Sequence, residues 1–224
     1  MPALHPDDTP IGRTTAHQEL PLAARKWGRI IDTSQLMAGD LILTQPVDVT
    51  KDWISARIQR AQGNLGASHG CWTHAAVYLG DGQHVCEANL KVPGYRDSVM
   101  LRSLQEHSDA AHVLRARRPK VQSERERMGI AVGAMRQIGN PYSLRQIYQF
   151  WRMARTGRFW ATPNVTTPIN TRALVCSTLY QDALTFARAG ASIRFGTVCT
   201  PAHLSANTAD FESHDPPLAW LELE

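Results

Sequence analysis

Apolar residues recur at two different periods along this chain, and the two periods predict different elements. Apolar runs beside turn residues predict strands at 36–44, 72–79, 83–88, 112–117 and 193–198. Apolar residues spaced three or four apart predict helices at 51–62, 124–138 and 172–190. The pattern leaves 98–104 open between strand and helix, and predicts a helical turn at 20–27 and a turn at 200–204. Thr178 and Gln181 fit a capping box in the first turn of the helix at 172–190.

A β-hairpin is predicted where two strands flank the turn Gly80-Asp81-Gly82. If Asp81 and Gly82 form a two-residue turn, the paired residues are Val77 with Cys86 and Ala76 with Glu87. Because alternate residues of a strand share a face, His74 and Glu87 then lie on one face as diagonal neighbours. The opposite face carries Val77, Leu79, His84 and Cys86.

Cys176 lies where a loop becomes the helix at 172–190. The unpaired N–H groups and the dipole of a helix start favour a thiolate over a thiol. A cysteine nucleophile also needs a histidine base and a third polar group that orients the imidazole. His74 and Glu87 fit these two roles. The backbone N–H of Cys176 and the hydroxyl of Tyr142 are the expected donors to an oxyanion.

Five segments resemble the NlpC/P60 papain-like superfamily. They are GDLILT at 39–44, THAAVYLGDGQHVCEAN at 73–89, GNPYS at 139–143, VCSTLYQDAL at 175–184 and TPAHL at 200–204. In the unpermuted family the cysteine precedes the histidine hairpin, whereas here the hairpin comes first. This order is similar to that of the circularly permuted branch, the YiiX/YebB-type and LRAT-like proteins. The resemblance implies an α+β, permuted papain-like fold in which an antiparallel sheet packs against helices.

The resemblance also implies roles for individual residues. Cys176 matches the nucleophile, His74 the base, Glu87 the third polar residue and Tyr142 the tyrosine on the oxyanion side. No cofactor is implied. The implied activity is a cysteine hydrolase that cleaves an amide bond in bacterial peptidoglycan peptides through a covalent acyl-enzyme. Because LRAT-like relatives act on lipid acyl groups, a lipid acyl hydrolase or acyltransferase with the same Cys-His pair is the alternative. Two residues depart from the family pattern: Val175, where the family commonly has Asp, and Thr178. These departures concern the identity of the substrate more than the chemistry.

A second constellation has residue types that bind zinc. Cys71 and His74, with His84 and Cys86, suggest a non-catalytic, zinc-stabilised or binding module as a further alternative. The hairpin parity predicts that His84 and Cys86 face away from His74, so we expect no metal there. For the same reason Glu87, and not His84, is expected to orient His74.

The domain organisation follows from these segments. The expected parts are an extended arm at 1–34, a catalytic domain at 35–206 and a tail or surface strand at 207–224. An aromatic and basic insert at 144–171 is a candidate lid, and its part at 144–160 a candidate contact with a membrane surface.

Composition narrows the class of protein. The 224 residues are 43% hydrophobic and carry a net charge of +4, with no apolar run of membrane-spanning length. The scattered charge gives no specific indication of nucleic acid binding. Four irregularly spaced cysteines predict a reducing compartment. No signal peptide is recognisable, so we expect synthesis in the bacterial cytoplasm, with delivery to the periplasm or another cell if the protein is an effector. An effector would also have an inhibitor or immunity partner.

Overall fold

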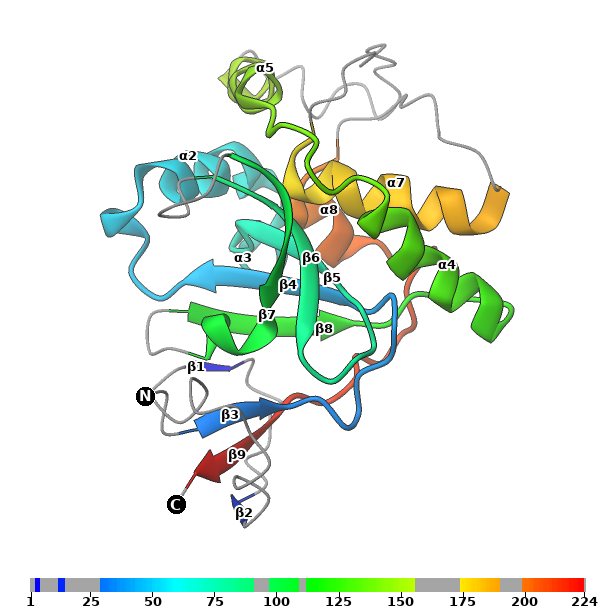
Figure 1. The fold of residues 1–224 in the computed structure, drawn as a ribbon. Coiled ribbons are helices and arrows are strands. Elements are labelled where there is room, and N and C mark those ends of the chain that lie inside the picture. Colours follow the sequence, from blue (N-terminus) through cyan, green and yellow to red (C-terminus); the bar gives the residue numbers. More distant parts are fainter. Residues whose placement is uncertain are drawn as a thin grey trace.

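A six-stranded, mostly antiparallel sheet forms the centre of the protein, with strand order β1-β8-β4-β5-β6-β7 (Figure 1). The computed structural model describes residues 3–4, 12–14, 29–90, 97–108, 112–155, 174–189 and 199–223. The strands of the central sheet are β1 (Ala3–Leu4), β4 (Leu41–Pro46), β5 (His74–Tyr78), β6 (His84–Asn89), β7 (Ser98–Ser103) and β8 (His112–Arg117). A smaller sheet of order β2-β9-β3 contains β2 (Gly12–Thr14), β3 (Arg29–Asp32) and β9 (Ala219–Leu223).

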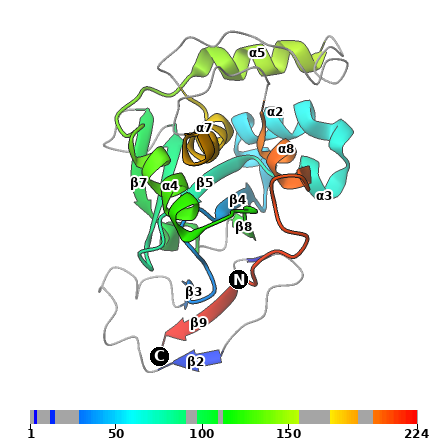
Figure 2. The same cartoon turned by 90° about the vertical axis from the view of Figure 1, so that its right-hand side faces the viewer.

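Helices lie mainly around one face and one end of the central sheet (Figures 1 and 2). The α-helices are α2 (Trp53–Gln62), α3 (Ala67–Gly70), α4 (Glu124–Met135), α5 (Leu144–Arg155), α7 (Cys176–Ala189) and α8 (Pro201–Ala206). Short 3-10 helices are η2 (Val49–Lys51), η3 (Gly63–Leu65) and η4 (Leu104–His107). The structure therefore has the expected α+β class, with antiparallel strands packed against helices.

Both faces of the central sheet are apolar, because its strands are buried on both sides. One face packs against α4 and α7, and its core includes Leu41, Leu43, Val77, Ile130 and Leu179. The other face packs against the smaller sheet, and its core includes Ile42, Tyr78, Leu114, Leu218 and Trp220. This alternation places consecutive residues of β4 and β5 in different cores.

The smaller sheet joins two segments far apart in the sequence. β3 pairs antiparallel with β9, and Ile31 lies opposite Trp220. Leu218 and Trp220 are buried, at 1% and 2% exposure. The strand near residue 220 was predicted to lie at the surface, and burial of its apolar side chains against the central sheet corrects that prediction.

Most of the predicted elements are present, and 98–104, left open between strand and helix, forms β7. The turn predicted at 200–204 is wrong. This segment begins α8, because Thr200 caps its N-terminus and Pro201 occupies its first turn. The strand predicted at 193–198 and the helical turn at 20–27 lie outside the described residues, as does 156–171 of the predicted insert.

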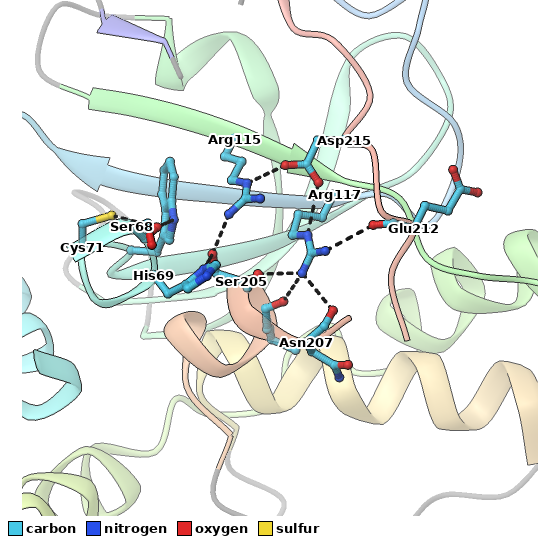
Figure 3. A network of polar contacts seen from close by, with 11 residues as sticks. Ser68, His69, Cys71, Arg115, Arg117, Ser205, Asn207, Glu212 and Asp215 are labelled. Carbon is cyan, nitrogen blue, oxygen red and sulfur yellow. Dashed lines mark hydrogen bonds and ion pairs between the residues drawn. The ribbon is translucent and has the colours of Figure 1, made fainter. Parts of the chain in front are cut away.

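A partly buried polar network fixes α8 and α3 against β8 (Figure 3). Arg115 and Arg117 both donate to the carboxylate of Asp215, at 2.6 and 3.2 Å. Arg115 also donates to the Ser205 hydroxyl, which in turn is hydrogen-bonded to Nδ1 of His69 at 2.9 Å. A single Arg117 nitrogen donates to the carbonyls of Leu204, Ser205 and Asn207. Carbonyl groups at the end of a helix lack N–H partners within the helix. Arg117 provides the missing hydrogen-bond donor for these three carbonyls.

Candidate active site

Cys176 is the first residue of α7 and is 4% exposed. The Thr178 hydroxyl accepts from the N–H of Val175 and donates to its carbonyl, both at 3.0 Å. The predicted capping box between Thr178 and Gln181 is therefore wrong, because Thr178 bonds backward to Val175. The side-chain oxygen of Gln181 is buried without a hydrogen-bond partner in the described part of the chain. The helix start nevertheless falls where the sequence predicted it, so the sulfur lies at the positive end of the helix dipole.

The hairpin that carries His74 has the predicted register. Ala76 pairs with Glu87, and Val77 pairs with Cys86. The tight turn requires glycine at position 80, where φ is +84° and a Cβ atom would lie 2.7 Å from the Cβ of Ala38. This register brings Glu87 to the same side of the hairpin as His74.

His74 interacts with both Glu87 and Cys176. Its Nε2 lies 2.7 Å from Oε2 of Glu87. Burial lowers the pKa of His74, but the Glu87 charge, a hydrogen bond to Cys176 and the Cys176 charge outweigh it and raise that pKa from 6.5 to about 10. Because Nε2 is occupied by Glu87, Nδ1 is the nitrogen left for the Cys176 thiol. The arrangement stabilises the imidazolium form of His74.

Glu87 is fully buried, at 0% exposure, and has several partners besides His74. Asn89 donates to its Oε1 at 2.8 Å, and Arg102 lies 3.4 Å from the same oxygen. Nε2 of His107 lies 3.4 Å from Oε2. Burial raises the pKa of Glu87, but His74 and His107 outweigh it and hold that pKa well below its usual value of 4.5. Glu87 is therefore a carboxylate at neutral pH.

Sequence reasoning missed these additional partners of Glu87. Asn89 was within its reach, because it lies two residues after Glu87 and shares its face of β6. Arg102 comes from β7, a segment whose sequence was ambiguous between strand and helix, so its pairing with β6 had no local signal.

Tyr142 lies close to Cys176 through backbone pairing. Leu174 donates to the carbonyl of Pro141 at 3.0 Å, and Ser143 donates to the carbonyl of Leu174 at 2.9 Å. Burial and the charge of Cys176, with a smaller effect of Asp97, raise the pKa of Tyr142 well above 10. Its hydroxyl is therefore protonated and can donate a hydrogen bond.

Two cavities meet at this site. An apolar cavity of about 310 Å³ is bounded by α2, α5 and the start of α7, and Cys176 is in its wall. A polar cavity of about 500 Å³ contains His74 and Tyr142 in its wall, with Arg102 and His107. Both cavities have Ile54, Ile58 and Thr73 in common. The Cys-His pair thus lies between an apolar and a polar compartment.

The four residues of the zinc-site alternative, Cys71, His74, His84 and Cys86, do not come together to form a metal site. Cys86 is buried in the core on the α7 side, whereas His84 pairs with the half-exposed carboxylate of Asp81 at 2.6 Å. Cys71 donates to the carbonyl of Ser68 at 3.7 Å. Within the described ranges, no group of three or more His, Cys, Asp or Glu side chains could hold a metal ion.

Comparisons with known proteins add no identification. No protein-family model matches this chain, and a search of curated proteins also finds no match. Among the described helices, none is both long enough and apolar enough to cross a bilayer.

Proposed function

We propose that the protein is a cysteine hydrolase with a circularly permuted papain-like fold and a Cys176-His74-Glu87 triad. One observation carries this proposal: the His74 imidazole is hydrogen-bonded to the buried Glu87 carboxylate, and Cys176 at the start of α7 is close enough to help raise the pKa of His74. A buried ion pair of this kind has no evident role in stabilising the core, whereas it provides a nucleophile and a proton donor.

The triad supports a two-step reaction. The Cys176 thiolate attacks the carbonyl carbon of the substrate, and the negative charge moves to the carbonyl oxygen. The backbone N–H of Cys176 and the hydroxyl of Tyr142 stabilise that oxyanion. His74 then donates its proton to the leaving nitrogen or oxygen as that bond breaks, which leaves an acyl-enzyme. Water attacks the acyl-enzyme with His74 as base, and the carbon–sulfur bond breaks.

The leading substrate is an amide bond in a peptidoglycan peptide. This assignment rests on the resemblance to NlpC/P60 proteins, and the polar cavity at His74 supports it. Arg102, His107 and Asn89 in its wall provide donors for the carbonyl and carboxylate groups of such a peptide.

A lipid acyl group is the second candidate, and the apolar cavity at Cys176 favours it. Its wall is formed mainly by Trp53, Ile54, Ile58, Leu144, Ile147 and Tyr148. An acyl chain gains about 0.8 kcal/mol for each CH₂ group buried in such surroundings. The chemistry at Cys176 is the same for both candidates.

Substitution of the triad tests the proposal. We expect Cys176→Ala to form no acyl-enzyme, and His74→Ala to lower kcat/KM by about 10²–10⁴-fold. Glu87→Gln should have a smaller effect, because it removes the charge but retains a group that can orient the imidazole. Peptidoglycan fragments and phospholipid vesicles are incubated with each variant, and mass spectrometry measures the products and any adduct on Cys176.

The matched control is Cys199→Ala, since Cys199 is a buried cysteine of the same core. Circular dichroism establishes that each variant is folded. Turnover of either substrate by folded Cys176→Ala would contradict the proposal. An adduct with a peptide or with an acyl chain would decide between the two substrates.

A further inference from the structure

The charged residues of α2 and α5 all have the same sign. The two helices have the sequences WISARIQRAQ and LRQIYQFWRMAR, which contain arginine but neither Asp nor Glu. Arg57 and Arg60 on α2 are exposed, as are Arg145 and Arg152 on α5. The whole chain has 24 Lys and Arg against 20 Asp and Glu, and these two helices hold five of the arginines. Outside α2 and α5, acidic and basic residues are therefore nearly equal in number.

The same two helices expose large apolar side chains. Trp53 is 55% exposed, and Leu144 and Tyr148 are each 58% exposed. All three also contribute to the wall of the apolar cavity that contains Cys176. The exposed apolar residues are therefore continuous with the cavity. The guanidinium group of Arg57 lies over the Trp53 ring, 4.8 Å from its centroid, so charge and aromatic surface are adjacent.

The position of the helices makes this surface accessible to a large partner. In both overall views α5 is the outermost helix, lying across α2 and the start of α7 on the side away from the smaller sheet (Figures 1 and 2). A flat partner approaching that side would meet α5 and α2 first. We call the exposed residues Trp53, Arg57, Arg60, Leu144, Arg145, Tyr148 and Arg152 the α2–α5 surface.

We infer that the α2–α5 surface docks on a bilayer that contains anionic phospholipids. Tryptophan and tyrosine favour the interface between headgroups and acyl chains, and leucine favours the region below it. Arginines at the same level are attracted to anionic headgroups. A nucleic acid would use the arginines but would leave Leu144 in water, so the combination favours a membrane.

A second exposed apolar stripe lacks this combination and provides the control. Met128 and Val132 on α4 are 46% and 42% exposed. Their helix carries Glu124 and Glu126 in its first turn, beside Arg125. An anionic membrane would repel these carboxylates, so α4 is not expected to dock.

Vesicle cosedimentation of the full chain tests the inference. The protein carries Cys176→Ala, so docking is measured without turnover and does not depend on the proposed function. We expect binding to vesicles of phosphatidylcholine mixed with phosphatidylglycerol, and weaker binding as the salt concentration rises. Arg57→Ala and Arg145→Ala should each weaken binding about fivefold, which corresponds to ~1 kcal/mol per arginine. Tyr148→Ala should also weaken it.

The controls are Arg125→Ala and Met128→Ala, which should bind as the parent does. Equal binding to vesicles of phosphatidylcholine alone, no binding to either vesicle, or an equal effect of the α4 substitutions would overturn the inference. Equally tight binding of a single-stranded DNA oligonucleotide would also overturn it, because the surface would then recognise polyanions in general. If the vesicles are bound but the protein that retains Cys176 turns over neither substrate, the proposed function is rejected and the docking inference stands.

Discussion

At the scale of single residues, Glu87 determines the electrostatics of the candidate site. It is a fully buried carboxylate, and it stabilises the protonated form of His74. Since the folded-state pKa of His74 is raised from 6.5 to about 10, this stabilisation is fully present below pH 6.5 and is lost as the pH rises through 10. In the proposed reaction, His74 would also lose the ability to donate its proton to a leaving group as the pH rises through 10.

Removing the charge of Glu87 should lower the pKa of His74. We expect the His74 proton to titrate near pH 10 in the parent protein and at clearly lower pH in Glu87→Gln, because the carboxylate no longer stabilises the imidazolium. An NMR titration of the His74 ring measures this without any substrate. Asp81→Asn, on the same hairpin but paired with His84, is the control and should leave His74 unchanged. An unchanged titration in Glu87→Gln would show that Glu87 does not hold the proton on His74.

The contact between His74 and Glu87 was predictable, because a two-residue turn fixes the register of a hairpin and register fixes the face. The proximity of His74 to Cys176 could not be predicted from the local hydrophobic pattern of the sequence. It depends on where the start of α7 lies relative to His74, the first residue of β5, and only the resemblance to a known family indicated it. His107 reaches Glu87 from η4, whose position relative to β6 likewise has no local signal.

At the scale of elements, the close packing of α4 on α7 positions the cysteine helix. A Cβ atom at position 133 would lie 3.0 Å from the Cα atom and the carbonyl oxygen of Ala183. These are backbone atoms, so they cannot move without shifting α7. The glycine therefore allows the two helix backbones to approach each other.

Gly133→Ala should separate α4 from α7 and lower the free energy of unfolding by about 1–3 kcal/mol. Gly63→Ala is the matched control, because a Cβ atom there meets nothing within 4 Å and φ is −56°. That variant should be as stable as the parent or slightly more stable. Urea denaturation measures both. Equal midpoints for the two variants would contradict the packing argument.

Helices with long periodic patterns were predicted well, and short elements were not. The α2 and α7 helices have ten and fourteen residues, enough for their apolar spacing to be read. The α8 helix has six residues, too few for periodicity. Its start signal was nevertheless present in the sequence, as Thr200 followed by Pro201.

At the scale of the whole molecule, two cores on opposite faces of one sheet stabilise the fold. The core on the side of α7 contains Cys176, and the core on the other side contains Trp220 from the smaller sheet. No local pattern predicted this second core. Pairing of β3 with β9 joins residues about 190 positions apart in the sequence. The apolar face that these two strands cover belongs to strands of the central sheet, which lie between them in the sequence.

Trp220→Ala should leave a cavity in the second core and destabilise the protein by about 3–5 kcal/mol. Trp53→Ala removes the same side chain from an exposed position and should change stability by less than about 0.5 kcal/mol. Thermal unfolding followed by near-ultraviolet circular dichroism measures both. Similar melting temperatures would mean that the smaller sheet does not contribute to global stability.

The order of the His74 hairpin and α7 along the chain has a consequence for biosynthesis. The ribosome makes the His74 hairpin first and Cys176 about 100 residues later. Until α7 packs against β5, the sulfur has neither a neighbouring imidazolium nor a helix dipole, and it has the reactivity of any free cysteine. If the proposed function is correct, hydrolytic activity therefore appears only once the tertiary structure is complete.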